Sequence, residues 1–245
     1  MDSEKRSIVI ALCGKGGVGK TSISAMMIKI LLQDDDAKVL AIDADPMIGL
    51  GAALNIKVDK TVDDIRNDII SKKTELVNLE YEVLDAMIEK DKLSFLAIGS
   101  SEEDKGLAET NTMLKDVIAS IATDFDYIII DGAAGIEQIN RKFMEKVTHL
   151  VLVSDTSTNG INIVNTINEV AKDLIEYEEV GIILNRIEKK EEVKKVNLSD
   201  EIPILSYITD IEALRNINIS GKNILEVPES GLIQPIRCAL SKLNI

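Results

Sequence analysis

The chain of 245 residues has only two cysteines, one histidine and no tryptophan. Cys13 and Cys238 lie far apart and follow no C-x-C or C-x-x-C spacing, so the sequence has no disulfide framework and no thiolate metal motif. We expect each of them to be a buried structural thiol. His149 opens an apolar run, and we expect a structural or surface role for it. This cysteine usage fits a reducing cytosol.

Long uncharged apolar runs are also missing. The amino-terminal segment, MDSEKRSIVIALCGKGG, has charges followed by a short apolar run, which suits neither a secretory signal nor a membrane span. No other segment approaches the roughly 18 apolar residues that a spanning helix needs. We therefore expect a cytoplasmic protein that does not act in a membrane.

Positive charge is scarce, with 28 Lys and Arg residues against 42 Asp and Glu residues and a formal net charge of −14. A chain with this balance repels phosphate polymers, so DNA or RNA is disfavoured as a partner. The densest charged segment, residues 186–201, mixes both signs and is typical of a solvated helix or loop.

The chain has only four prolines and no internal repeat, so we expect a single domain over residues 1–245. Apolar runs alternate with amphipathic stretches, as in an α/β fold with a doubly wound, mostly parallel sheet. Runs rich in Ile, Val and Leu suit strands that are covered on both faces. The expected strands are 7–13, 38–43, 93–99, 126–131, 149–154, 180–185 and 202–208. The expected helices are 22–33, 111–122, 136–147 and 161–175.

The motif GKGGVGKTS follows the first expected strand and opens the first expected helix. Its spacing is that of a phosphate-binding loop, whose glycines let backbone N–H groups surround an anion at a helix N-terminus. Lys20 would reach the β- and γ-phosphates of a nucleotide, and the Thr21 hydroxyl would reach a magnesium ion. The predicted loop residues are Gly14, Lys15, Gly16, Gly17, Val18, Gly19, Lys20, Thr21 and Ser22.

Acidic residues follow two other expected strands. Asp131 ends the strand DYIIID, where a carboxylate can hold the water shell of magnesium. Asp43 and Asp45 lie two residues apart after the second strand, so in an extended chain both would project from the same face. One of these two carboxylates can serve the metal shell while the other orients the attacking water.

With these motifs the chain resembles the MinD/ParA/NifH class of P-loop ATPases, and we expect residues 1–245 to form a single P-loop ATPase domain. The matching segments are KGGVGKT (15–21), DADP (43–46), IIIDGAAG (128–135) and ILNR (183–186). The resemblance implies a homodimer that encloses two ATP molecules, with Lys15 reaching the phosphates bound by the other subunit. It assigns Asp45 to the attacking water and Asp43 and Asp131, with Thr21, to magnesium. It also implies that Asn185 and Arg186 bind the adenine.

Within that class, the chain is similar to the CooC group of accessory ATPases for nickel insertion into carbon monoxide dehydrogenase. The likeness is carried by DGAAGIEQINR (131–141) and DTSTNGINIVNTI (155–167). CooC proteins have a metal-binding C-x-C pair, whereas the corresponding segment here contains Leu107, Ala108 and Glu109. Our first hypothesis is an ATP-hydrolysing factor that matures or activates a client metalloenzyme or corrinoid enzyme without itself holding the metal.

The alternative is a positioning switch of the MinD or ParA type. A membrane-bound switch needs a basic amphipathic tail, but residues 231–245 have few cations, and we expect them to form a helix docked on the core. A reductase of the NifH type is disfavoured, because neither Cys13 nor Cys238 lies where the interfacial iron–sulfur cluster would need a ligand.

Overall fold

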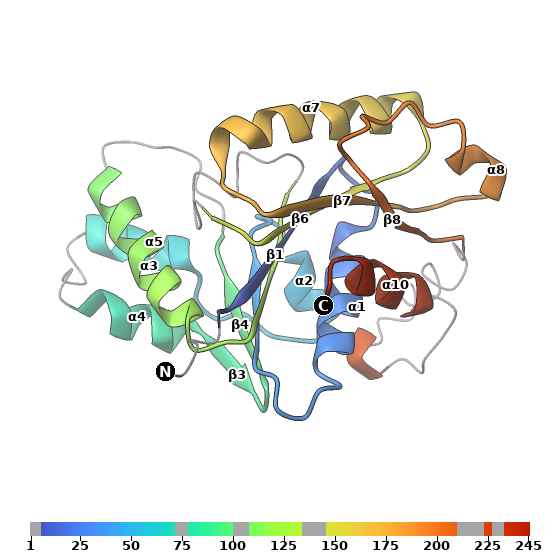
Figure 1. The fold of residues 1–245 in the computed structure, drawn as a ribbon. Helices are drawn as coiled ribbons and strands as arrows, with labels where there is room; N and C mark the ends of the chain where they lie inside the picture. Colours follow the sequence, from blue (N-terminus) through green and yellow to red (C-terminus); the bar gives the residue numbers. More distant parts are fainter. Residues whose placement is uncertain (1–5, 72–77, 100–107, 134–145, 210–222, 227–232) are drawn as a thin grey trace, which may run out of the picture.

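The computed structural model describes residues 6–71, 78–99, 108–133, 146–209, 223–226 and 233–245. Within these ranges the strands form one eight-stranded sheet in the order β3-β4-β2-β5-β1-β6-β7-β8 (Figure 1). The strands are β1 (Ile8–Gly14), β2 (Val39–Asp43), β3 (Ile88–Lys90), β4 (Leu93–Ala97), β5 (Tyr127–Asp131), β6 (His149–Ser154), β7 (Glu179–Leu184) and β8 (Ile204–Tyr207). Only β3 and β4 pair antiparallel among these strands. The predicted α/β, mostly parallel sheet is confirmed.

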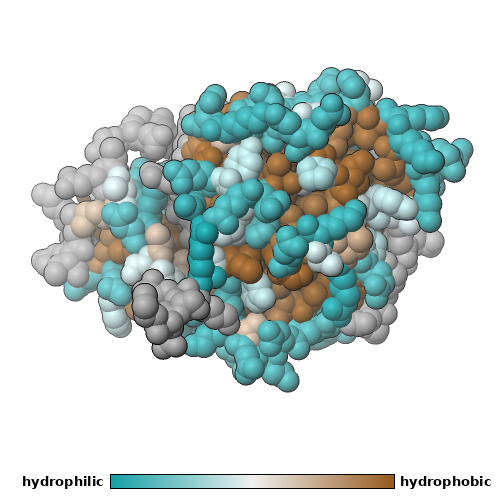
Figure 2. All heavy atoms as spheres, in the orientation of Figure 1, coloured by the Kyte–Doolittle hydropathy of each residue, from teal (hydrophilic) through white to brown (hydrophobic). Residues whose placement is uncertain are grey.

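Helices cover both faces of the sheet (Figure 1). They are α1 (Lys20–Leu31), α2 (Gly49–Ala53), α3 (Val62–Ile70), α4 (Leu79–Ala86), α5 (Ala108–Ala122), α7 (Thr158–Leu174), α8 (Lys190–Val193) and α10 (Ile233–Lys242), with a 3-10 turn, η2 (Ile224–Glu226). In the same view, Figure 2 shows hydrophilic residues over the outer face of α7 and apolar residues between α7 and α10.

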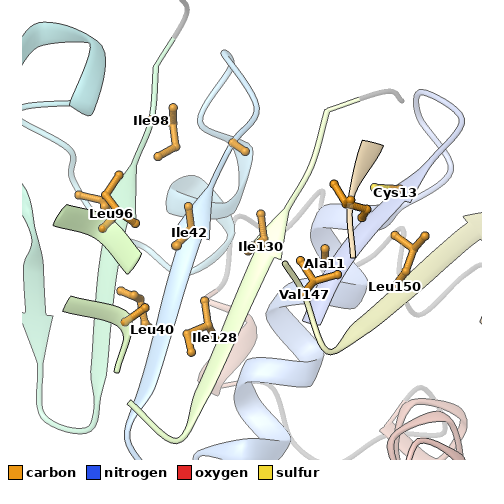
Figure 3. Packing of buried hydrophobic residues seen from close by; sticks show 14 of the residues in the cluster. Ala11, Cys13, Leu40, Ile42, Leu96, Ile98, Ile128, Ile130, Val147 and Leu150 are labelled. Carbon is orange, nitrogen blue, oxygen red and sulfur yellow. The ribbon is translucent and has the colours of Figure 1, made fainter. Parts of the chain in front are cut away.

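Two hydrophobic clusters lie on opposite faces of the sheet. Alternate residues of β1 illustrate the division, because Ala11 and Cys13 join one cluster while Ile10 and Leu12 join the other. The first cluster includes apolar residues of α3, α4, α5 and α7, and part of it is drawn in Figure 3. The second packs against α1, α2 and α10. A strand covered on both faces needs apolar residues at every position, which explains the continuous apolar runs.

The expected elements differ from the structure in a few places. The short strand β3 and the helices α2, α3 and α4 were not among them, whereas α8 lies in the segment 186–201 that was expected to be a solvated helix or loop. The expected helix 136–147 lies outside the described residues except for its end. The prediction of helix at 146–147 is wrong, because Lys146 forms a parallel bridge with Glu176 and the Val147 N–H donates to the Glu176 carbonyl. The chain is therefore already aligned with the sheet before β6 begins.

The expectations for the two cysteines are met at Cys13 and not at Cys238. Cys13 is fully buried, and burial raises the pKa of its thiol to about 12, as expected for a structural cysteine. The prediction that Cys238 is buried is wrong, because it lies on the exposed side of α10. The buried side of that helix carries Ile236 and Leu240. His149 is buried and bonds to the Thr148 hydroxyl and to the Leu243 carbonyl, so its role is structural.

The carboxyl-terminal segment forms a docked helix, as expected. Helix α10 buries its apolar residues against α1 and β8. No helix in the described ranges combines the length and apolar content needed to cross a membrane.

Candidate nucleotide site

The phosphate-binding loop lies at the carboxyl edge of the sheet, between the end of β1 at Gly14 and the start of α1 at Lys20. Strand β1 pairs with β5 on one side and β6 on the other, so the chain changes direction across the sheet here. Such a switch point is where open α/β sheets bind ligands.

Two glycines of the loop are required by its geometry. Gly14 has φ 150°, and a Cβ on it would lie 2.0 Å from the Val153 carbonyl oxygen of the neighbouring strand. Gly19 has φ 97°, and its Cβ would lie 2.6 Å from Asn185 Nδ2. L-residues with a side chain rarely adopt such φ values, and neither site has room for one. Gly16 and Gly17 are exposed, whereas Val18 is buried.

Lys20 lies folded over the loop. Its Nζ donates to the Gly14 carbonyl at 3.4 Å and to the Lys15 carbonyl at 3.2 Å. Burial lowers the pKa of this ammonium, and the charges of Asp131 and Asp45 act in the opposite direction. The side chain thus holds a positive charge among carbonyl oxygens that a phosphate oxygen can replace. Of the other α1 residues predicted for the site, Ser22 is buried and Thr21 is partly exposed.

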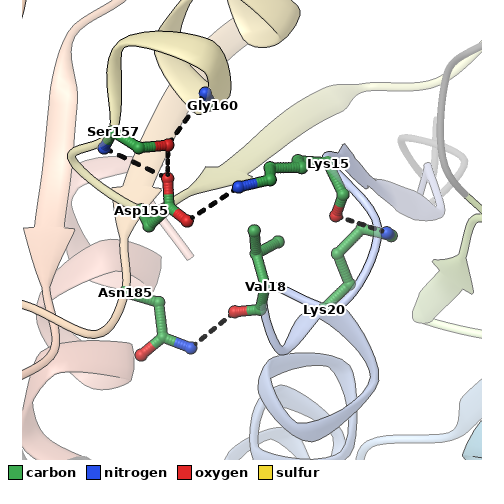
Figure 4. A network of polar contacts seen from close by, with 7 residues as sticks. All are labelled: Lys15, Val18, Lys20, Asp155, Ser157, Gly160 and Asn185. Atoms are coloured by element: carbon green, nitrogen blue, oxygen red, sulfur yellow. Dashed lines mark hydrogen bonds and ion pairs between the residues drawn. The ribbon is translucent and has the colours of Figure 1, made fainter.

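Lys15 points to a different part of the site. Its Nζ lies 3.1 Å from Asp155 Oδ2, in the turn between β6 and α7 (Figure 4). The other oxygen of Asp155 accepts from the Ser157 backbone N–H and hydroxyl, and the Ser157 hydroxyl caps α7 by accepting from the Gly160 N–H. The two loop lysines therefore have separate partners.

Asp43 and Asp131 lie side by side as the last residues of β2 and β5, where they are register partners. Both carboxylates are buried, with 0% and 1% of their residue surfaces exposed. Asp43 accepts from the backbone N–H groups of Asp45, Leu50 and Gly51. Burial, with the nearby charge of Asp131, raises the pKa of Asp43 to about 7.

Asp131 faces the first turns of α1. Its Oδ1 accepts from the Ser24 hydroxyl at 2.9 Å, whereas its Oδ2 is buried without a hydrogen-bond partner in the described part of the chain. Burial raises the pKa of Asp131 to about 6, although Thr21, Ser24 and Lys20 act to lower it. A buried carboxylate oxygen with no donor, beside a second carboxylate and a threonine hydroxyl, fits the all-oxygen ligand set that Mg2+ prefers.

Asp45 begins a turn just beyond β2. The Ala44 N–H still donates to the Asp131 carbonyl of β5, and the Ile48 N–H then closes a turn by donating to the Asp45 carbonyl. The Asp45 N–H donates to Asp43 Oδ1, and Asp45 Oδ1 accepts from the Met47 N–H. That both carboxylates project from one face stays a prediction, and the side-chain bonds to the backbone favour the turn at 45–48. Asp45 still lies close enough to Asp131 to affect its pKa.

The turn after β7 contacts the phosphate-binding loop, and β7 lies on the other side of β1 from β2 and β5. Asn185 is 1% exposed, and its Nδ2 donates to the Val18 carbonyl at 2.7 Å (Figure 4). Its Oδ1 accepts from the N–H of Arg186, a residue that is exposed and has φ 60°. Asn185 thus fixes the shape of the phosphate-binding loop, a role that the sequence did not indicate.

Four residues of the site were not predicted from the sequence: Ser24, Asp155, Ser157 and Gly160. The only signal for Asp155 was its place after a buried strand, in a DTS segment typical of a helix cap. Ser24 lies four residues after Lys20 on α1, which turns it toward the same edge of the sheet.

No group of three or more His, Cys, Asp or Glu side chains suited to a metal ion occurs among the described residues. In the segment that corresponds to the CooC thiolate pair, residues 104–107 lie outside the described ranges.

Comparisons with known proteins agree with this geometry. Residues 9–224 match the family described as CobQ/CobB/MinD/ParA nucleotide binding domain. An uncharacterised ATP-binding protein of Methanocaldococcus jannaschii is 28% identical, and the alignment covers 91% of this chain and 92% of that protein. The septum site-determining protein MinD of Thermotoga maritima is 29% identical, over 77% of this chain and 67% of that protein.

The carbon monoxide dehydrogenase accessory protein CooC of Rhodospirillum rubrum is 27% identical, over 67% of this chain and 69% of that protein. Among solved structures, MinD of Pyrococcus horikoshii in complex with Mg-ADP has a TM-score of 0.66 and 20% identity, covering 98% of this chain and 96% of that one. The structural likeness is one of fold.

Proposed function

Because the chain belongs to the CobQ/CobB/MinD/ParA nucleotide-binding domain family of ATPases, we propose that it is a dimeric switch that binds ATP with Mg2+ and hydrolyses it. The observation that carries this proposal is the meeting of three features at one edge of the sheet. These features are the phosphate-binding loop, the paired carboxylates of Asp43 and Asp131, and the Asp131 Oδ2, which has no hydrogen-bond partner among the described residues.

In this proposal the backbone N–H groups of residues 14–22 bind the phosphates, and Lys20 exchanges its carbonyl partners for β- and γ-phosphate oxygens. Thr21 and Asp131 would hold Mg2+, with Asp43 in its water shell. The ion neutralises phosphate charge when bound. Asn185 and Arg186 would border the adenine, with Asn185 also holding the loop through Val18.

Asp45 is proposed to orient the attacking water. It lies in the turn that follows β2, beside Lys20 and Asp131, so a small movement of that turn would move its carboxylate relative to the phosphates. Lys15 is proposed to cross to the phosphates of a second subunit, where a cation stabilises charge that develops on the transferred phosphoryl group. ATP binding and dimerisation would thereby be coupled.

The chemical part of this proposal is tested by steady-state ATP hydrolysis. Lys20→Ala and Asp45→Asn are expected to lower the rate by at least about 100-fold, as is usual for groups that act on the transition state. Lys38→Ala and Asp36→Asn are matched controls, since both residues are exposed and distant in sequence from the loop. Unchanged rates in Lys20→Ala or Asp45→Asn would mean that the assigned chemistry is wrong.

For the biological role, we propose an accessory factor that matures or activates a client metalloenzyme, of the nickel carbon monoxide dehydrogenase or corrinoid type. The CooC relative and the resemblance of segments 131–141 and 155–167 support this role. Neither cysteine belongs to a thiolate pair, so the client rather than the switch would hold the metal. ATP-driven change of shape would be the contribution of this chain.

A second candidate is a nucleotide-dependent positioning switch, which is favoured by the MinD relative. Capture on Asp45→Asn protein, which is expected to keep ATP bound, separates the two roles. A nickel, iron–sulfur or corrinoid enzyme retained from native extract with ATP but not with ADP would support the maturation role. Retention of lipid vesicles or DNA under the same conditions would support positioning instead.

A further inference from the structure

Lys15 forms an ion pair with Asp155, a contact that binding of phosphate by the loop does not require. Lys15 Nζ lies 3.1 Å from Asp155 Oδ2, and the two side chains are 29% and 22% exposed. Each lies far from the other in sequence, one in the phosphate-binding loop and one in the β6–α7 turn. The ion pair therefore ties the loop to a second element of the same subunit (Figure 4).

Asp155 is held in place independently of Lys15. Its Oδ1 accepts from the Ser157 N–H at 3.1 Å and from the Ser157 hydroxyl, which in turn caps the start of α7. Burial alone would raise the pKa of Asp155, but the hydrogen bonds from Ser157 and Lys15 outweigh it and lower that pKa. The Asp155 carboxylate is thus ionised and held in a fixed position, and the flexible Lys15 side chain binds to it.

From this geometry we propose that Asp155 is a positioning residue that keeps Lys15 on its own subunit until a nucleotide-bound dimer forms. This inference rests on the proposed role of Lys15 across the dimer. In this proposal Lys15 Nζ gives up its 3.1 Å contact with Asp155 when it reaches the phosphates of another subunit. Dimerisation must therefore break one such ion pair in each subunit, which disfavours pairing of chains that lack nucleotide.

The size of the effect follows from the exposure of the pair. A partly exposed ion pair typically changes an equilibrium constant by about 2- to 5-fold. Since two pairs are released for each dimer, their loss is expected to tighten the dimer by about 4- to 25-fold.

Two variants remove the contact in different ways. Asp155→Asn keeps the oxygen that accepts from Ser157 but presents an amide instead of a carboxylate to Lys15. Gly160→Ala keeps the charge, but its Cβ would lie 2.4 Å from Asp155 Oδ1 and 2.5 Å from Ser154 Oγ, so both side chains must shift. Glu192→Gln is the matched control, because Glu192 accepts from Thr156 in the same turn at 3.2 Å and does not contact Lys15.

The first measurement is the dimer dissociation constant by analytical ultracentrifugation, with Mg2+ and a non-hydrolysable ATP analogue. Asp155→Asn and Gly160→Ala are expected to tighten the dimer by the factor given above, while Glu192→Gln matches the wild type. The second is acylation of the Lys15 amine in nucleotide-free protein, followed by mass spectrometry. It is expected to be about 2- to 5-fold faster in the two variants.

An unchanged dimer constant in both variants would overturn the proposal, whether or not Lys15 acylation becomes faster. A weaker dimer would also overturn it, since Asp155 would then assist pairing. Failure of the proposed function has a different result: the wild type itself would remain monomeric with the ATP analogue, and that result would overturn both proposals.

Discussion

Replacing Asn185 with alanine is expected to destabilise the nucleotide-free protein through the phosphate-binding loop. The side chain is 1% exposed, and its Nδ2 donates to the Val18 carbonyl at 2.7 Å. Alanine would remove this donor and leave the carbonyl without its partner, which costs about 1–3 kcal/mol when the group is buried. For a chain of 245 residues, the usual unfolding entropy of about 2.1 cal/mol/K per residue converts this loss into a Tm decrease of about 2–6 °C.

Differential scanning calorimetry without nucleotide measures the effect. Asn165→Ala is the matched control, because partly exposed Asn165 makes similar bonds to the Asn197 carbonyl and the Ser199 N–H. Water can replace those bonds, so the control is expected to lower Tm by clearly less. If Asn185→Ala lowered Tm no more than Asn165→Ala, the loop would not depend on Asn185, and the reasoning would be refuted.

Three further outcomes follow from the site and the core. Between about pH 5 and pH 8, the free energy of unfolding of the nucleotide-free protein should fall as pH rises, because the folded pKa values of Asp43 and Asp131, about 7 and about 6, exceed the ordinary 3.8. The folded chain then holds protons that the unfolded chain has released. Urea unfolding across this pH range measures the slope, and Asp43→Asn should make the slope smaller. A free energy of unfolding that rises with pH would contradict this prediction. Gly14→Ala should lower stability more than Gly17→Ala. A Cβ at Gly14 would lie 2.0 Å from the Val153 carbonyl, whereas a Cβ at Gly17 would have no atom within 4 Å. Equal Tm values of the two variants would count against this packing. Maleimide should label exposed Cys238 in the folded protein and Cys13 only after unfolding, and peptide mass spectrometry showing equal labelling would exclude the buried site.

The parallel sheet was predictable because burial on both faces leaves a local record. The residues of β2, β5 and β6 are nearly all buried, and each strand is a continuous apolar run in the sequence. Helices α3 and α4 lack so clear a record, since a charged sequence such as VDDIRNDII owes its helix to the Thr61 capping box and to tertiary packing. That residues 1–245 form one domain stays a prediction.

The site was predictable where chemistry and spacing coincide. The loop was predicted from its motif, and Asp43 and Asp131 were predicted from their positions at strand ends. The fold brings all of them to one edge of the sheet. The contacts of Asn185 with Val18 and of Lys15 with Asp155 span 167 and 140 residues. No local pattern encodes such pairs, so they required the structure. At Asp45, side-chain bonds to nearby backbone groups and the Ile48 N–H form a turn whose exact start the sequence did not specify.

The most direct test of the account is a mixing experiment between two inactive variants. Lys15→Ala keeps a complete hydrolytic site but donates no lysine, whereas Asp45→Asn donates Lys15 but cannot orient water at its own site. If Lys15 acts across the dimer, each mixed dimer has one complete site, and ATP hydrolysis should reappear when the two proteins are combined with Mg2+. If the mixture is as inactive as its components while wild-type protein hydrolyses ATP, Lys15 acts within its own subunit, and the proposed coupling of hydrolysis to dimerisation is contradicted.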